Sequence, residues 1–184
     1  AIIIEPTKFV IKTIKNLMME GLIKNGNFLD LGCGTGSEPA FAAESGFTVT
    51  AVDRNPLTEE VPNITFVQSL IEDFVIEEGK YDVIFADNAL PFLTKDNAKK
   101  VLIDASSKIK PDGTMSFTLF GANDAWAKDE NMSSKMNFWD REEAYSFVKG
   151  LNLPVYRTDD EEGFAPTMKG EIKYWHIFKF ILKK

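Results

Sequence analysis

The stretch Phe28-Leu29-Asp30-Leu31-Gly32-Cys33-Gly34-Thr35-Gly36 decides the fold of this 184-residue chain. It opens with an apolar run that predicts a buried strand, and three alternating glycines lead from there into a predicted helix, 37–45. Glycine permits a sharp turn and lets a ligand approach the backbone without meeting a Cβ atom. The N-terminal amides of the following helix point to the same place. The stretch therefore predicts a strand–loop–helix unit that binds a ligand.

The spacing of the glycines argues against a dinucleotide ligand. The pattern Gly-x-Gly-x-x-Gly would need a glycine at position 37 or 39, where Ser37 and Pro39 stand. The chain instead has Gly-x-Gly-x-Gly, with Asp30 two positions before the first glycine. A carboxylate at that place suits a ligand with an ammonium group better than one with a pyrophosphate.

A second carboxylate, Asp53, ends the next predicted strand, 48–52. An acid in this position can accept hydrogen bonds from both hydroxyls of a ribose. The alternative is that Asp53 only caps the turn at Asn55-Pro56. Together with the glycine loop, its position favours the ribose.

Strands and helices alternate along the chain, and several of the strands are apolar throughout. This pattern predicts one α/β domain over residues 1–184, with a mostly parallel sheet covered on both faces. We expect the segments 123–137 and 159–170 to be irregular loops. The predicted helices are 6–21, 37–45, 97–109 and 141–151, and the predicted strands are 28–31, 48–52, 64–67, 81–86, 114–120, 155–158 and 175–182.

Composition excludes several classes of protein. The net charge of −7 opposes binding to phosphate backbones, so nucleic acid is not an expected partner. A single cysteine, Cys33, and a single histidine, His176, leave no disulfide framework, no His/Cys zinc site and no Ser-His-Asp triad with a spare histidine. We therefore expect no metal. Apolar stretches far shorter than the roughly 20 residues of a membrane span, and the lack of a signal peptide pattern, predict no membrane partner and a cytoplasmic location.

Several motifs resemble those of class I methyltransferases that use S-adenosylmethionine (SAM). Residues 29–36 resemble motif I of that family, Asp53 its ribose-binding acid, 66–74 the stretch beside the adenine, 81–90 motif IV, and 109–114 the turn before strand five. The resemblance implies a Rossmann-like, seven-stranded sheet whose last strand is antiparallel. The cofactor-binding residues that it implies are Asp30, Gly32, Cys33, Gly34, Gly36, Asp53, Arg54, Ser69, Leu70, Ile71, Asp87, Asn88 and Ala89.

Two regions refine this resemblance. Ser69 stands where the family often has an acid, so the adenine contact falls to its hydroxyl or to the backbone of Leu70. Residues 121–126 and 173–178 resemble the tellurite-resistance (TehB-like) branch, although tellurite methylation does not follow, because such folds host many substrates. The helix within residues 1–22 is a candidate lid over the cofactor.

The implied reaction is the transfer of a methyl group from SAM to a small-molecule acceptor by in-line displacement. It needs alignment of the reactants, and it needs a general base only if the acceptor must lose a proton. Phe92, Phe120 and Trp126 are candidates for the acceptor wall, with ordinary core packing as the alternative. His176 is the candidate proton acceptor, although a hydrogen-bonded place in the sheet is the favoured interpretation. Cys33 is interpreted as a small packing residue, not a nucleophile.

Two other functions stay open at this point. The first is an NAD-dependent oxidoreductase, for which Tyr145 and Lys149 have the bare Tyr-x-x-x-Lys spacing. The second is a SAM-binding scaffold without turnover. A nucleic-acid methyltransferase is disfavoured, because the chain has Asp87-Asn88-Ala89-Leu90 where amino-methylating enzymes have Asp/Asn-Pro-Pro-aromatic. We expect a monomer or a homodimer.

Overall fold

The computed structural model of the protein describes residues 6–87 and 89–184, with side chains from Thr13 onward. Seven strands form one sheet in the order β3-β2-β1-β4-β5-β7-β6. The strands are β1 (Gly26–Leu31), β2 (Phe47–Asp53), β3 (Ile64–Gln68), β4 (Val83–Ala86), β5 (Thr114–Phe120), β6 (Val155–Pro166) and β7 (Ile172–Lys183). The helices are α1 (Pro6–Met19), α2 (Ser37–Glu44), α3 (Lys95–Lys108), α4 (Glu130–Ser133) and α5 (Arg141–Gly150), with 3-10 turns η1 (Ile71–Asp73), η2 (Leu90–Phe92) and η3 (Ala125–Lys128).

The pairing of the strands matches the predicted mixed sheet. Strands β1 to β5 pair in parallel, and β7 lies antiparallel between β5 and β6. The last strand in the sequence is therefore the antiparallel one, as expected. This order reverses at β1 and β4, which is where ligands bind in open α/β sheets, beyond the carboxyl ends of the strands.

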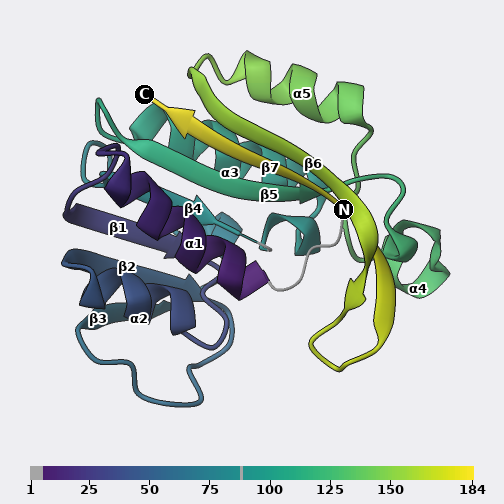
Figure 1. Ribbon diagram of the computed structural model, residues 1–184, viewed down its shortest axis with the longest axis horizontal. Helices are drawn as coiled ribbons and strands as arrows, with labels where there is room; N and C mark the ends of the chain where they lie inside the picture. The colour runs from purple at the N-terminus through teal and green to yellow at the C-terminus, as the bar shows by residue number, and fades with distance from the viewer. Residues whose placement is uncertain (1–5, 88) are drawn as a thin grey trace.

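Helices cover both faces of the sheet, so its central strands are buried on both sides. Figure 1 shows α1 and α2 in front of the sheet and α3 behind it. The face under α1 and α2 is packed with apolar side chains that include Phe28, Val49, Phe85 and Ile181. The opposite face, under α3 and α5, forms the larger core around Leu29, Ile84, Phe117 and Phe180. Every residue of β4 and β5 is buried, and β4 accordingly reads as a continuous apolar run, while β5 alternates apolar residues with Thr114, Ser116 and Thr118.

The prediction of a loop over 159–170 was wrong for its first half. Residues Asp159 to Pro166 continue β6, which pairs with β7 along their length. The acidic side chains are tolerated there because cations face them. Arg141 lies 3.0 Å from Asp160, and Lys179 lies 3.0 Å from Glu161.

The segment 123–137 is also more regular than expected, because it contains η3 and α4. Two aspartates start these turns. Asp124 accepts a hydrogen bond from the amide of Trp126, and Asp129 accepts from the amides of Asn131 and Met132. Aspartate is a preferred residue at helix starts because its carboxylate satisfies these amides. In the described part of the chain, every helix is too short or too polar to span a bilayer.

Candidate active site

The glycine loop lies beyond the carboxyl end of β1, with its glycines in a conformation that other residues rarely adopt. Gly32, Gly34 and Gly36 have φ angles of 82°, 56° and 91°. A Cβ atom on Gly32 would lie 2.4 Å from the Cβ of Ala89 and 3.3 Å from the Cδ1 of Ile71. The loop therefore meets both the β3–η1 and the β4–η2 connections.

The other two glycines differ in their surroundings. A Cβ on Gly34 would meet no atom within 4 Å, whereas one on Gly36 would lie 2.8 Å from Val61. Gly34 thus faces the open side of the loop, where a ligand can approach its backbone. Cys33, between Gly32 and Gly34, is buried, and burial raises the pKa of its thiol to about 12. This agrees with a packing residue, because the reactive form of cysteine is the thiolate.

Asp53 holds the loop through its two carboxylate oxygens. Oδ2 accepts from the amide of Gly34 at 2.9 Å, and Oδ1 accepts from the amide of Asn55 at 2.9 Å. The predicted turn cap is thus made, and the same side chain also holds the glycine loop, a contact that the sequence did not predict. A carboxylate oxygen has two lone pairs, so each retains the capacity to accept from a hydroxyl. The side chain of Arg54 is exposed beside it.

The predicted adenine stretch follows β3 at the same edge of the sheet. The amide of Ser69 donates to the carbonyl of Asp53 at 3.0 Å, which ties this stretch to the end of β2. The hydroxyl of Ser69 donates to the carbonyl of Leu70 at 2.8 Å. Its oxygen can therefore still accept a hydrogen bond from a ligand. Leu70 is 43% exposed and Ile71 packs near Gly32, so these residues line the side of the loop.

Two carboxyl groups beside the loop each have a buried oxygen without a hydrogen-bond partner among the described residues: Asp30 Oδ2 and Asp87 Oδ2. Burial raises the pKa of Asp30 well above its usual value, and the nearby charges of Glu38, Asp87 and Asp53 raise it further. Burial also raises the pKa of Asp87, to about 6, against the hydrogen bond from Thr118.

Unsatisfied buried carboxyl oxygens are costly, and they indicate a missing partner. A ligand that carries an ammonium and a sulfonium group supplies the positive charge that these acids lack. The site therefore fits SAM. Asn88, also predicted to contact the cofactor, lies outside the described residues.

The three aromatic residues predicted for the acceptor wall do come together. The ring centroids of Phe92, Phe120 and Trp126 lie 6.3 to 6.4 Å from one another. Phe120 is fully buried, in agreement with the core-packing alternative, while Phe92 is 50% exposed. Phe92 is therefore the most exposed member of the cluster, while Trp126 is partly buried.

The sequence analysis missed the charged centre of this cluster, Lys173. Its ammonium lies 3.5 Å from the ring centroid of Trp175 and 4.1 Å from that of Trp126. It also forms an ion pair of 2.6 Å with Asp124, and both side chains are almost fully buried. Burial lowers the pKa of Lys173, while the contact with Asp124 acts in the opposite direction. An amphipathic lysine in a strand gives no local sign of such a role, because its partner comes from a distant turn.

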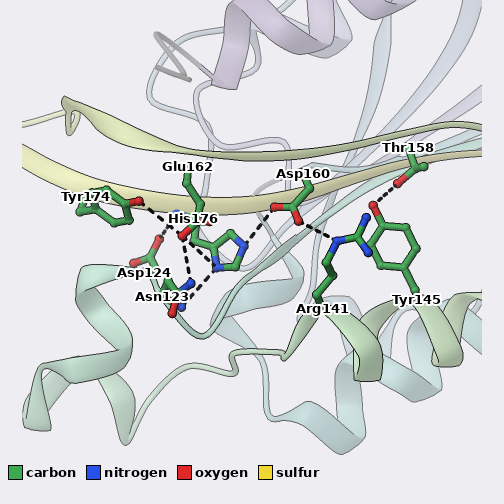
Figure 2. A network of polar contacts seen from close by, with 9 residues as sticks. All are labelled: Asn123, Asp124, Arg141, Tyr145, Thr158, Asp160, Glu162, Tyr174 and His176. Atoms are coloured by element: carbon green, nitrogen blue, oxygen red, sulfur yellow. Dashed lines mark hydrogen bonds and ion pairs between the residues drawn. The ribbon is translucent and has the colours of Figure 1, made fainter.

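His176 occupies a hydrogen-bonded place in the sheet, as the favoured interpretation held (Figure 2). Its Nδ1 accepts from the amide of Asn123 at 3.2 Å, so its Nε2 carries the proton toward Asp160 Oδ1 at 3.1 Å. A Cβ on Gly121 would lie 2.1 Å from Nδ1, so the ring packs directly on the backbone. With both nitrogens occupied, His176 has no free nitrogen for a substrate proton. Because ligand atoms of Asp160, Glu162 and His176 lie within 4.8 Å of one another, the expected absence of a metal stays a prediction.

Comparison with known proteins agrees with this geometry. A family model described as a methyltransferase domain matches residues 7–155. The chain belongs to this methyltransferase family. An uncharacterized methyltransferase, sll0829 of Synechocystis, is 27% identical over 146 residues, which are 77% of this chain and 68% of that protein.

Solved structures share the fold. TehB from Haemophilus influenzae has a TM-score of 0.76 at 18% identity, over 96% of this chain and 62% of TehB. A Burkholderia thailandensis 1,6-didemethyltoxoflavin N1-methyltransferase, solved with its substrate and S-adenosylhomocysteine, has a TM-score of 0.69 at 17% identity, over 95% of this chain and 78% of that one. The expected class I methyltransferase and its SAM cofactor are thereby confirmed.

Proposed function

We propose that this methyltransferase acts on a small-molecule acceptor that enters between the glycine loop and the aromatic cluster of Phe92, Phe120 and Trp126. The observation that carries this proposal is the continuity between the two. Gly32 lies against Ala89, and the turn η2 leads from Ala89 to Phe92. Phe92 in turn packs beside Phe120 and Trp126. An acceptor bound against Phe92 is thereby placed next to the cofactor loop.

When bound, SAM supplies an electrophilic methyl group on a sulfonium centre. We infer that Asp30 and Asp87 hold its cationic groups and that Asp53 holds its ribose. Gly32, Gly34, Gly36 and the 69–71 stretch would shape the surrounding cleft. Because the donor is intrinsically reactive, the protein mainly aligns the nucleophile and excludes water. We also propose that the helix within residues 1–22 closes over this site as part of a single domain, 1–184.

Binding heats test the cofactor assignment. We expect SAM and S-adenosylhomocysteine to bind the wild type with micromolar dissociation constants, and Asp53→Ala to weaken both at least tenfold. NAD is the control ligand. Binding of NAD in place of SAM would favour the oxidoreductase alternative, and SAM binding without turnover on any acceptor would favour the scaffold alternative.

The methyl acceptor is identified by measuring methyl transfer to small molecules of different chemical classes. The likeness to TehB concerns the fold, so a tellurium oxyanion is one acceptor to test beside aromatic heterocycles. The net charge of −7 supports a partner other than nucleic acid. A single buried thiol at Cys33 is in keeping with the proposed cytoplasmic location, and we propose a monomer or a homodimer.

A further inference from the structure

A row of polar side chains crosses the sheet face under α1, from β4 to the β6 edge. The hydroxyl of Thr118 donates to Asp87 Oδ1, and Thr118 pairs in register with Lys179 on β7. Lys179 in turn forms an ion pair of 3.0 Å with Glu161 on β6. Thr118 and Lys179 are only 2% and 6% exposed. Charges are expensive to bury, so a buried row of this kind needs a functional or structural reason.

The row ends at the carboxyl group of Asp87, of which one oxygen accepts a hydrogen bond and the other has no hydrogen-bond partner among the described residues. The first is Oδ1, which is fixed by Thr118, and the second is Oδ2, which is buried. Burial and, to a smaller extent, the charge of Glu38 raise the pKa of this group to about 6, while the hydrogen bond from Thr118 and the charge of Lys179 act in the opposite direction. A carboxylate with a pKa near the working pH is suited to proton transfer.

Asp87 lies in the chain between the two parts of the site. Asp87 directly follows β4 and stands two residues before Ala89, which touches the glycine loop. Asp30, on the neighbouring strand β1, lies opposite Phe85 of β4, so the two acids lie near each other at the carboxyl ends of adjacent strands, and the charge of Asp87 raises the pKa of Asp30. Phe92, the exposed member of the aromatic cluster, belongs to the turn η2 that follows. His176, the other candidate base, already has both ring nitrogens occupied.

We propose that Asp87 Oδ2 removes the proton from the nucleophilic atom of the acceptor, and that the acceptor is a compound with an ionisable O–H or N–H, such as a phenol, an enol or an acidic ring nitrogen. This inference rests on the proposed function and names its substrate class. The nucleophilic atom bonds to the methyl carbon while the carbon–sulfur bond breaks and leaves its electron pair on sulfur. The proton of the acceptor passes to Asp87 and then to solvent. Thr118 and Lys179 are positioning residues for the carboxylate.

The test measures methyl transfer by the full chain against pH, with saturating SAM. The probes are a series of para-substituted phenols of graded acidity, and tellurite is the acceptor without a carbon-bound hydroxyl. For the phenols we expect kcat/KM to fall below a pH at or under about 6, since the positive charge of bound SAM opposes the rise in the pKa of Asp87. Asp87→Asn should lose this acid limb and about 100-fold or more in kcat. Its SAM dissociation constant should rise as well, because Asp87 is proposed to hold a cationic group of the cofactor, so kcat is compared at saturating SAM.

Two variants separate proton transfer from positioning. Thr118→Val removes the hydroxyl that stabilises the ionised carboxylate, so the acid limb should move to higher pH with kcat retained above it. Asp82→Asn is the control, because it makes the same chemical change directly before the first residue of β4. Asp82 pairs with Lys110 at 3.1 Å, and its substitution should leave the acid limb of the pH profile unchanged. In Asp87→Asn the rate should recover as the pH passes the pKa of each phenol, because the acceptor then arrives already ionised.

Other outcomes overturn the inference. A pH profile shared by the wild type and Asp87→Asn would exclude Asp87 as the base. Methylation of tellurite with no turnover of any phenol would exclude the acceptor class. No SAM binding by the wild type, or no turnover of any probe including tellurite, would instead contradict the proposed function, so the two failures are distinguishable.

Discussion

The β1, β2 and β4 half of the sheet and the β5, β7 and β6 half present their polar groups in opposite ways. In the first half, Asp30 and Asp87 keep carboxyl oxygens that have no partner among the described residues. In the second half, Lys173 is paired with Asp124, and His176 has partners at both ring nitrogens. The first half is thus completed by a cationic ligand, whereas the second is assembled beforehand as a rigid wall. Variants that disturb one half alone test this division.

The largest effect is expected at the ion pair in the aromatic wall. Lys173→Met would leave Asp124 buried without its cation, and breaking such a pair costs about 3–5 kcal/mol of unfolding free energy. Urea unfolding measures this loss. Lys108→Met removes a half-exposed lysine 3.0 Å from Asp104 and should cost less than about 1 kcal/mol. Equal losses in the two variants would contradict a pre-assembled wall.

The next effect concerns the unpartnered acid Asp87. Its pKa is raised from 3.8 to about 6, so the folded protein binds more protons than the unfolded chain between these pH values. Its contribution to stability is therefore largest in acid and falls by up to about 3 kcal/mol as the pH rises through 6. Between pH 4.5 and 7.5 this loss amounts to about 2 kcal/mol of unfolding free energy, and Asp87→Asn should lack it. An identical pH dependence in both proteins would mean that Asp87 is already satisfied without a ligand.

A third variant perturbs the cofactor half alone. Gly32→Ala places a Cβ 2.4 Å from that of Ala89 at a φ of 82°, so it should weaken SAM binding by about 100-fold, or about 2.7 kcal/mol. Calorimetric titration measures this. Gly46→Ala is the matched control, because its φ is 101° but its Cβ would meet no atom within 4 Å. If both substitutions weaken SAM equally, backbone strain and not the contact with Ala89 is responsible.

The smallest effect is expected at the open face of the wall. Phe92→Ala should raise KM for the acceptor about tenfold, with the SAM dissociation constant and the stability nearly unchanged. Phe92 is 50% exposed, so its removal leaves no cavity in the core. Phe164→Ala, a 62% exposed residue on β6, is the control that should leave KM unaltered. Steady-state kinetics at saturating SAM distinguish the two.

The sequence predicted the cofactor half well because its signals are local. The strand, the glycines and the helix of residues 28–44 follow one another directly, and Asp53 ends the next strand. The acceptor half depends on partners that are distant in the chain. No residue close to Lys173 in the sequence indicates that it pairs with Asp124. The acidic run 159–162 is typical of a solvated loop, and only the structure shows that Arg141 and Lys179 form ion pairs with it.

His176 shows the same limit for a single residue. Its ring could have served as a base on sequence grounds, and only its packing on Gly121 and its contacts with Asn123 and Asp160 define its place. Thr118 is the converse case. It reads as an ordinary strand residue, yet its hydroxyl fixes the carboxylate of Asp87.

The acidic run on β6 has a consequence for how copies of this protein behave when they are crowded. Strand β6 is the last in the strand order, so its outer side has the form of a template on which another chain can add a strand. Asp159 to Glu162 place four consecutive negative charges there, pointing alternately to both faces. Any strand that docked against this edge would need to bring cations for both of its own faces. The acidic run that made the second part of β6 look like a loop in the sequence is thus the feature that disfavours self-association of the sheet into fibres.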